Sequence, residues 1–231
     1  MTYPIFSLRQ GVPPAHLSSH IRAVVQQALD ERRLIGAVVL VAHNGELIHQ
    51  QAAGHADRES ARPMDLTTIF RLASVSKPIV STAALALVAQ GRLDLDEDIG
   101  RWLPGFQPRL IDGSPARITA RQLLSHTAGL GYRFFEPNAD GPYARAGVSD
   151  GMDSSDINLA ENLRRIASVP LLYAPGTSWG YSLATDVLGA LIEHIHGAPL
   201  DEAVRQWVTG PLGMIDTGFG VSDPQRVAQL R

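Results

Sequence analysis

The Asn44-Gly45 pair constrains the fold more than any other short segment of the chain. It follows an apolar, partly β-branched run over 37–42 and precedes a second run over 46–53. Asn-Gly between two such runs is the strongest short-range signal for a β-hairpin, because both turn residues tolerate a positive φ. A helix is predicted before the hairpin, over 15–33, with one apolar stripe formed by Ile21, Val24, Val25, Ala28 and Leu29. The segment therefore predicts an antiparallel sheet with a helix on one face.

The middle of the chain is predicted to be mostly helical. The apolar segment 79–89 is followed by Gly91, a residue type common just after a helix, and Pro78 fits the first turn of that helix. Further helices are expected over 120–125, 158–167, 185–196 and 201–209, with a long polar loop over 136–156. We expect an α+β fold in three parts: helix and hairpin over 1–70, a mostly helical domain over 71–210, and a return to the α/β domain over 211–231.

Composition narrows the function classes. A chain of 231 residues with 45% hydrophobic and 19% charged residues predicts one large or two small soluble globular domains. The net charge of −3 predicts neither a nucleic-acid nor a membrane partner, and the absence of cysteine excludes disulfides and thiol nucleophiles. No secretory signal pattern is seen over 1–10, and the apolar run over 79–89 is too short to span a bilayer. A cytoplasmic location is expected.

The chain has a single lysine, Lys77, and it stands three residues after Ser74. Arginine stays protonated, whereas a buried lysine can lose its proton and act as a base. Residues three apart share a helix face, so Lys77 can reach the Ser74 hydroxyl at the start of the predicted helix. Desolvation and the helix dipole are expected to lower the pKa of Lys77. The pattern predicts a serine nucleophile with a lysine base; the alternative is one lysine left by chance in an arginine-rich chain.

A second candidate element is the segment 173–183, Tyr-Ala-Pro-Gly-Thr-Ser-Trp-Gly-Tyr-Ser-Leu. Pro175-Gly176 makes a turn, and Tyr181 precedes the predicted helix over 185–196. Tyr181 could face the same cleft as Ser74 and relay a proton, although a plain core or surface tyrosine is the simpler interpretation of this segment taken alone.

With both elements present, the chain resembles the serine β-lactamase-like superfamily, which includes class C β-lactamases and penicillin-binding proteins, and most closely its family VIII carboxylesterases. The resemblance runs from about 17 to 219. It is carried by four stretches: the nucleophile segment 70–78, the Leu-Leu-Ser-His-Thr-Ala-Gly-Leu run over 123–130, the tyrosine motif over 175–182, and Pro-Leu-Gly-Met over 211–214 followed by Thr217.

The resemblance implies a class C β-lactamase-like fold and a role for each matched residue. Ser74 would be the acylated nucleophile and its backbone N–H one oxyanion donor. Lys77 would be the base, and Tyr181 the proton shuttle to the leaving group and for the deacylating water. No cofactor or metal is implied, and the partner would be a small ester substrate.

Two departures from the family pattern affect the expected function. Penicillin-recognising members have an asparagine two residues after the tyrosine, whereas this chain has Leu183, which favours an ester over a lactam amide. The family's third motif, whose strand supplies a second oxyanion N–H, and the strands that complete the sheet lie downstream of the matched region. We therefore expect a second chain or a later segment to complete the sheet and the oxyanion hole; without them, the chain would be an inactive relative.

Several other residues are candidates for chemistry or binding. Ser149 lies in a Gly-x-Ser-x-Gly match, but no buried strand precedes it. His126 could pair with a serine, although a hydrogen-bonded helix end is the preferred interpretation. The aromatic residues Tyr132, Phe134 and Phe135 are either core or the lining of an acyl pocket, and we predict substrate contacts by Tyr132, Phe135 and Leu183.

Metal sites are not expected. The alternation of Asp94, Asp96 and Asp98 lacks the glycine and glutamate of a calcium loop. His194 and His196 lie two apart on a predicted helix and so do not share a face.

The function predicted from the sequence is hydrolysis of short-chain carboxylic esters by a serine hydrolase, through an acyl-enzyme on Ser74. The alternatives are a β-lactamase, D,D-peptidase or acyltransferase of the same superfamily, or a non-catalytic domain that binds an acyl ligand or a partner chain.

Overall fold

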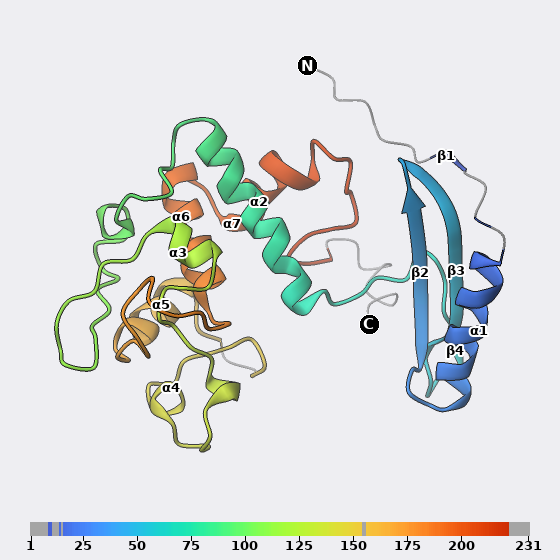
Figure 1. The fold of residues 1–231 in the computed structure, drawn as a ribbon, viewed down its shortest axis with the longest axis horizontal. Helices are drawn as coiled ribbons and strands as arrows, with labels where there is room; N and C mark the ends of the chain where they lie inside the picture. The colour runs from blue at the N-terminus through green and yellow to red at the C-terminus, as the bar shows by residue number, and fades with distance from the viewer. Residues whose placement is uncertain (1–8, 11–13, 15, 154–155, 222–231) are drawn as a thin grey trace. The chain divides into compact units, whose positions relative to one another are not determined.

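The computed structural model describes residues 9–10, 14, 16–153 and 156–221 (Figure 1). The chain divides into two compact units, one of residues 1–73 with 212–231 and the other of residues 74–211. The expected boundaries at 70/71 and 210/211 stay predictions, and the last part of the segment 211–231 lies outside the described residues.

The first unit contains a small sheet built around one long strand (Figure 1). Strand β3 (Glu46–Asp57) pairs antiparallel with β2 (Gly36–His43) along its length, and with β4 (Arg62–Pro63) near its end. The two-residue strand β1 (Arg9–Gln10) pairs parallel to the start of β3. Among the described residues, β3 is the one strand that pairs with β2.

The predicted hairpin is confirmed. Asn44 and Gly45 have φ values of 51° and 77°, which is the pair of positive angles that a two-residue hairpin turn requires. At the other end of the hairpin, Gly36 lies opposite Gly54, where a side chain is excluded because a Cβ on Gly36 would lie 2.3 Å from the His55 carbonyl oxygen. The return strand runs four residues beyond the predicted end at Ala53.

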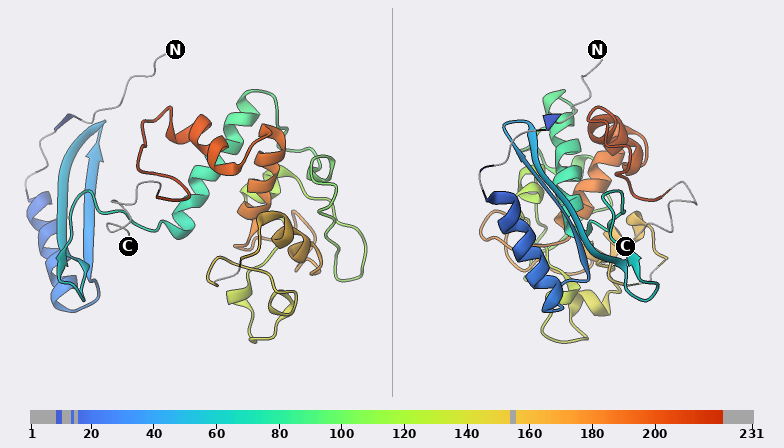
Figure 2. Two further views of the ribbon diagram at one scale, coloured as in Figure 1. Left: turned by 180° about the vertical axis from the view of Figure 1, so that it is seen from behind. Right: turned by 90° about the vertical axis from the view of Figure 1, so that its right-hand side faces the viewer.

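Helix α1 (Leu17–Asp30) confirms the predicted helix, with shorter bounds than 15–33. It lies along the β2–β3 ribbon in both orientations of the molecule (Figures 1 and 2). Val25 and Ala28 are buried, whereas Val24, on the predicted apolar stripe, is 51% exposed.

The second unit is mostly helical, as predicted. A 3₁₀ turn (Ala73–Val75) leads into α2 (Ser76–Ala89), and α3 (Ala120–Leu124), α5 (Leu159–Ala167) and α6 (Ala184–His196) match predicted helices. The expected helix over 201–209 is α7 (Leu200–Val204) followed by a π-helical turn (Arg205–Thr209). Two further 3₁₀ turns cover Ile99–Arg101 and Arg133–Phe135.

Close packing of α2 against α6 forms the centre of this unit (Figure 1). Ala83 and Ala84 of α2 are completely buried, and their small side chains allow the two helices to approach. The large buried residues of α6 are Val187, Leu188, Leu191, Ile192 and Ile195. Burying an apolar side chain of this size contributes about 1.5–3 kcal/mol, so this interface holds the start of α2 firmly relative to α6.

The segment 136–156 was expected to be a plain loop, and this is partly wrong, since it contains the short helix α4 (Pro142–Arg145). The Glu136 carboxylate explains the helix, because it accepts hydrogen bonds from the backbone N–H groups of Tyr143 at 2.6 Å and Ala144 at 3.1 Å. A side chain six or more residues earlier thus supplies the cap that the helix N-terminus needs.

The helices within the described ranges are all too short or too polar to cross a membrane.

Candidate active site

Ser74 lies at the turn that enters α2, as the sequence predicts. The preceding residue, Ala73, has a φ of 46°, in the left-handed region that an L-residue adopts only at a cost. The Ser74 side chain is exposed, so its hydroxyl is accessible to a small molecule.

Lys77 lies one helical turn further along and is directed at this serine. Its Nζ atom donates a hydrogen bond to Ser74 Oγ at 3.2 Å. The same Nζ atom lies 4.8 Å from the ring centroid of Tyr181 and 5.5 Å from that of Tyr132. The structure thus brings together Ser74, Lys77 and Tyr181, the three residues predicted to do the chemistry.

The expected low pKa of Lys77 is wrong. Burial lowers the pKa of the ammonium group, but interactions with the hydroxyl groups of Tyr132 and Tyr181 outweigh burial and raise the pKa above its ordinary value. Lys77 is only partly buried, so desolvation is too weak to neutralise it. The protonated ammonium is therefore the stable form of Lys77 in this arrangement.

Tyr181 shifts in the opposite direction. Burial raises the pKa of its hydroxyl, but hydrogen bonding with Lys77 and Ser74 and the charge of Lys77 outweigh burial and lower the pKa. These directions leave Lys77 charged beside a tyrosine that gives up its proton more readily than a free phenol.

The pKa of the neighbouring tyrosine, Tyr132, shifts in the opposite direction. The Tyr132 ring stacks on the Tyr181 ring with centroids 5.5 Å apart and an angle of 30° between the planes. Burial raises the pKa of Tyr132 despite its interaction with Lys77. Two tyrosines that contact the same lysine thus have pKa values pushed apart, which is the pattern of an acid–base pair with separate roles.

The two sequence motifs at 123–130 and 173–183 are joined by backbone hydrogen bonds. The carbonyl groups of residues 126, 127, 129 and 131 accept from the N–H groups of residues 180, 176, 172 and 183, with N–O distances of 2.8–3.1 Å. Gly129 must be glycine here, since its φ is 81° and a Cβ would lie 2.3 Å from the Tyr173 carbonyl oxygen. The first motif therefore forms the frame that carries Tyr181.

Asp186 is a residue of this region that the sequence analysis did not single out. It lies in the first turn of α6, five residues after Tyr181, and is partly buried. Burial raises the pKa of its carboxyl group to about 6, although the positive charge of Lys77 acts in the other direction. The feature of the sequence that could have identified Asp186 is its position directly after the tyrosine motif.

The three predicted substrate contacts have different surroundings. Phe135 is 61% exposed and Tyr132 is 5% exposed, and Phe134 stacks on the Tyr132 ring with centroids 4.4 Å apart. Leu183 does not fit the prediction, because it is 1% exposed and its side chain lies in the hydrophobic core at the start of α6. Its backbone N–H donates to the Gly131 carbonyl, which turns this residue inward.

A cavity of about 350 Å³ opens beside this aromatic cluster. Phe134 lines it, but so do the charged side chains of Arg133, Glu136 and Asp150. The cavity is therefore lined by charged as well as aromatic side chains.

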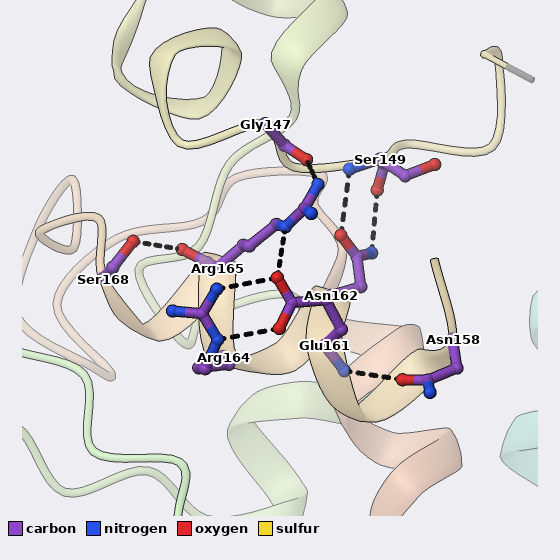
Figure 3. A network of polar contacts seen from close by, with 8 residues as sticks. All are labelled: Gly147, Ser149, Asn158, Glu161, Asn162, Arg164, Arg165 and Ser168. Atoms are coloured by element: carbon purple, nitrogen blue, oxygen red, sulfur yellow. Dashed lines mark hydrogen bonds and ion pairs between the residues drawn. The ribbon is translucent and has the colours of Figure 1, made fainter. Parts of the chain in front are cut away.

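The hydrogen bonds of Ser149, in the Gly-x-Ser-x-Gly match, hold its loop in place. Its Oγ donates to Asp153 at 2.6 Å, and its backbone N–H and carbonyl both bond to the side chain of buried Asn162 (Figure 3). On the same helix, Arg164 and Arg165 lower the pKa of Glu161 to about 2. This network fastens the loop to α5.

The described residues hold no cluster of histidine, aspartate or glutamate side chains suited to a metal ion. All three alternating aspartates have other partners: Asp94 accepts from the Asp96 N–H, Asp96 forms an ion pair with Arg121, and Asp98 accepts from the Gly100 N–H.

Comparisons with known proteins identify the family of the chain. The model of the family described as Beta-lactamase matches residues 21–230. Esterase EstB of Burkholderia gladioli is 55% identical over 214 residues, which cover 93% of this chain and 54% of that protein. Protein Rv1367c of Mycobacterium tuberculosis is 37% identical over 220 residues, 90% of this chain and 53% of that protein.

Solved structures give the same result for the fold. EstCE1, described as a hydrolase with promiscuous acyltransferase activity, superposes with a TM-score of 0.89 at 48% identity and covers 93% of this chain and 55% of its own. Simvastatin synthase (LovD) from Aspergillus terreus superposes with a TM-score of 0.74 at 27% identity, over 94% of this chain and 58% of its own. These likenesses confirm the predicted α+β, β-lactamase-like fold class.

The chain spans about half the length of the relatives that it matches. The resemblance to esterases of the β-lactamase-like superfamily, drawn from four sequence stretches, is confirmed by the match to EstB. With 210 of its 231 residues, 21–230, matched by the family model, the chain belongs to the beta-lactamase family.

Proposed function

We propose that the protein is a serine hydrolase that cleaves short-chain carboxylic esters through an acyl-enzyme on Ser74. The observation that carries this proposal is the hydrogen bond from Lys77 Nζ to the accessible Ser74 hydroxyl, beside a tyrosine whose pKa is lowered. The name of the 55% identical relative, an esterase, supports the substrate class.

In the proposed acylation step, the Ser74 hydroxyl proton moves to the Tyr181 phenolate as Oγ attacks the ester carbonyl carbon. The Lys77 ammonium stays protonated, holds the two oxygens together and stabilises the negative charge of the phenolate. When the tetrahedral intermediate collapses, Tyr181 returns the proton to the departing alkoxide, which leaves as the alcohol. This assignment moves the role of base from Lys77, as expected from the sequence, to Tyr181 supported by Lys77.

Deacylation repeats the step with water as the nucleophile. Tyr181 accepts a proton from the water as the hydroxide oxygen attacks the acyl carbon, and it then returns the proton to Ser74 Oγ. The products are the carboxylic acid and the free serine, so protons balance over one turnover and no cofactor is consumed.

The direct test is hydrolysis of p-nitrophenyl acetate by the full-length protein and by its Ser74→Ala variant. We expect the variant to lose at least 10³-fold in kcat, because the acyl-enzyme cannot form. The Ser149→Ala variant is the matched control and should keep the parent rate. Equal rates for the parent and Ser74→Ala would refute the proposal.

Acyl transfer to an alcohol is a second candidate, favoured by the description of EstCE1, which is 48% identical, as a hydrolase with acyltransferase activity. Turnover of p-nitrophenyl butyrate in the presence of a primary alcohol, with both products quantified, separates the two functions. A butyrate ester in excess over butyric acid would favour transfer.

Turnover of a β-lactam is the less favoured alternative. Leu183 is buried and offers no carboxamide to a lactam side chain, so this position gives no support to lactam recognition. Nitrocefin turnover well below that of p-nitrophenyl butyrate is expected, and the reverse order would overturn the ester assignment.

A further inference from the structure

His126 occupies the position just after α3 where a helix commonly ends on glycine. Its φ is 55°, its N–H donates to the Leu123 carbonyl, and the next N–H, of Thr127, donates to the Gln122 carbonyl. These two bonds form a Schellman motif, in which the left-handed residue is usually glycine and sometimes asparagine. A histidine here has a strained backbone that glycine would avoid.

His126 contacts Tyr181 and both residues that flank it. The His126 carbonyl accepts a hydrogen bond from the Gly180 N–H at 2.9 Å. The His126 Nδ1 atom lies 3.3 Å from the Oγ atom of Ser182, which is 1% exposed. The imidazole ring packs on the Tyr181 ring, with centroids 4.8 Å apart and 43° between the planes.

We propose that His126 is the positioning residue of Tyr181, fixing the phenol ring beside Lys77 and Ser74 through the backbone of residue 180, the hydroxyl of Ser182 and direct ring contact. The proposal rests on the proposed function, in which Tyr181 exchanges a proton with Ser74. His126 itself touches no reacting atom and acts through the tyrosine.

The hydrogen bonds of Ser182 are compatible with the neutral form of His126. Ser182 Oγ accepts from the Ala184 N–H at 3.4 Å, which leaves its own proton free to be donated to Nδ1. Nδ1 is then the acceptor and the ring proton lies on Nε2. Burial, and secondly the charge of Lys77, lower the pKa of His126, in agreement with a neutral ring.

Protonation of His126 would change this arrangement, since a proton on Nδ1 would make His126 the donor in the bond to Ser182 Oγ. The ring would also become a second cation beside Lys77. The titratable groups that contact His126 or act on its charge are Lys77, Tyr173 and Tyr181, and Tyr132 and Asp186 interact with the same Lys77. Catalysis should therefore decline as His126 gains a proton below pH ~6.5, its ordinary pKa.

Two variants test the positioning role without straining the backbone. His126→Gly keeps the left-handed conformation and removes the whole side chain. His126→Asn also tolerates that conformation and keeps an acceptor for Ser182, but loses the ring contact. The readouts are kcat and KM for p-nitrophenyl butyrate and the rate constant for fluorophosphonate labelling of Ser74, each between pH 4.5 and 9.

We expect His126→Gly to reduce kcat and the labelling rate constant by about 10–100-fold with KM within threefold, because Tyr181 is misplaced and the ester site is not. His126→Asn should recover part of this loss. In the parent, kcat and the labelling rate constant should fall at acid pH as His126 gains a proton. Both His126 variants should lack this fall.

The matched control is His194→Asn, which removes an exposed histidine of α6 that packs edge-on to Trp102. It should keep the parent rates and pH profile. Each rate is divided by the fraction of protein that fluorophosphonate labels to completion, so a loss caused only by unfolded protein disappears on correction.

Parent-like corrected rates and an unshifted acid limb in both His126 variants would overturn the positioning role. That outcome is distinct from failure of the proposed function, which Ser74→Ala alone decides.

Discussion

The ammonium group of Lys77 lies 4.8 Å from the ring centroid of Tyr181, and the pair has pKa values that shift in opposite directions. Lys77 is held as a cation and Tyr181 is moved toward the phenolate. A lysine ammonium and a tyrosine phenolate hold as many protons as a neutral amine and a neutral phenol, but the vacant proton site then lies on the tyrosine oxygen, where it can take the proton of Ser74.

Removing the charge of Lys77 should raise the pKa of Tyr181. Lys77→Met is expected to lower kcat by about 10²–10⁴-fold, the range for a lost acid–base function, because Tyr181 then loses the interaction that lowers its pKa and gives up its proton less readily. The rate of Ser74 labelling should recover as the pH rises toward 10. A variant whose labelling rate stays flat with pH would show that Lys77 does not act through Tyr181.

The two tyrosines beside Lys77 should differ in their contribution to activity. Tyr181→Phe is expected to lose about 10²–10⁴-fold in kcat, whereas Tyr132→Phe should lose less than about tenfold, because burial keeps Tyr132 protonated. Phenylalanine preserves the stacking area in both variants, so steady-state kinetics compares the hydroxyl groups alone. Equal losses would assign the proton transfer to both rings.

Asp186 should make the stability of the protein depend on pH. Its pKa is raised from 3.8 to about 6 by burial, so the folded state binds the proton more tightly than the unfolded state. The resulting stabilisation is complete below pH 3.8 and is lost as the pH rises through about 6.

Asp186→Asn should therefore raise the free energy of unfolding by about 1–3 kcal/mol at pH 7.5 and leave it unchanged at pH 4. Urea denaturation at the two pH values measures the difference, with exposed Asp201→Asn as the control. A stability gain of the same size at both pH values would mean that the carboxyl group is not titrating.

Gly129→Ala should loosen the frame that carries Tyr181. Gly129 and Gly113 share a left-handed backbone, with φ values of 81° and 83°, but a Cβ would collide with the Tyr173 carbonyl only at Gly129. Gly113→Ala should cost about 1–2 kcal/mol from backbone strain alone. Gly129→Ala should cost at least about 2 kcal/mol more, by analogy with overpacking, in the same denaturation assay. Equal costs would show that the close approach is readily relieved.

Local chemistry made much of this fold predictable. The Asn44-Gly45 turn, the start of α2 at the Ser74 segment and the ends of the helices follow from turn residues and apolar spacing within a few positions. The juxtaposition of Ser74 and Lys77 is also local, since both lie on one face of one turn.

The features that sequence reasoning got wrong depend on residues distant in the chain. The raised pKa of Lys77 arises from Tyr132 and Tyr181, which are 55 and 104 positions away. Leu183 is buried because a backbone bond to Gly131 turns it toward the core. The sequence marks these residues as candidates, but their environments follow from tertiary packing.

The most direct test of the account is to trap the acyl group. The parent protein, quenched in acid within milliseconds of mixing with p-nitrophenyl butyrate, should gain one butyryl group, and peptide mapping should place it on Ser74. Tyr181→Phe should accumulate the same adduct more slowly, and Ser74→Ala should carry none. Steady turnover without an adduct, or an adduct on another serine such as Ser149, would contradict the account.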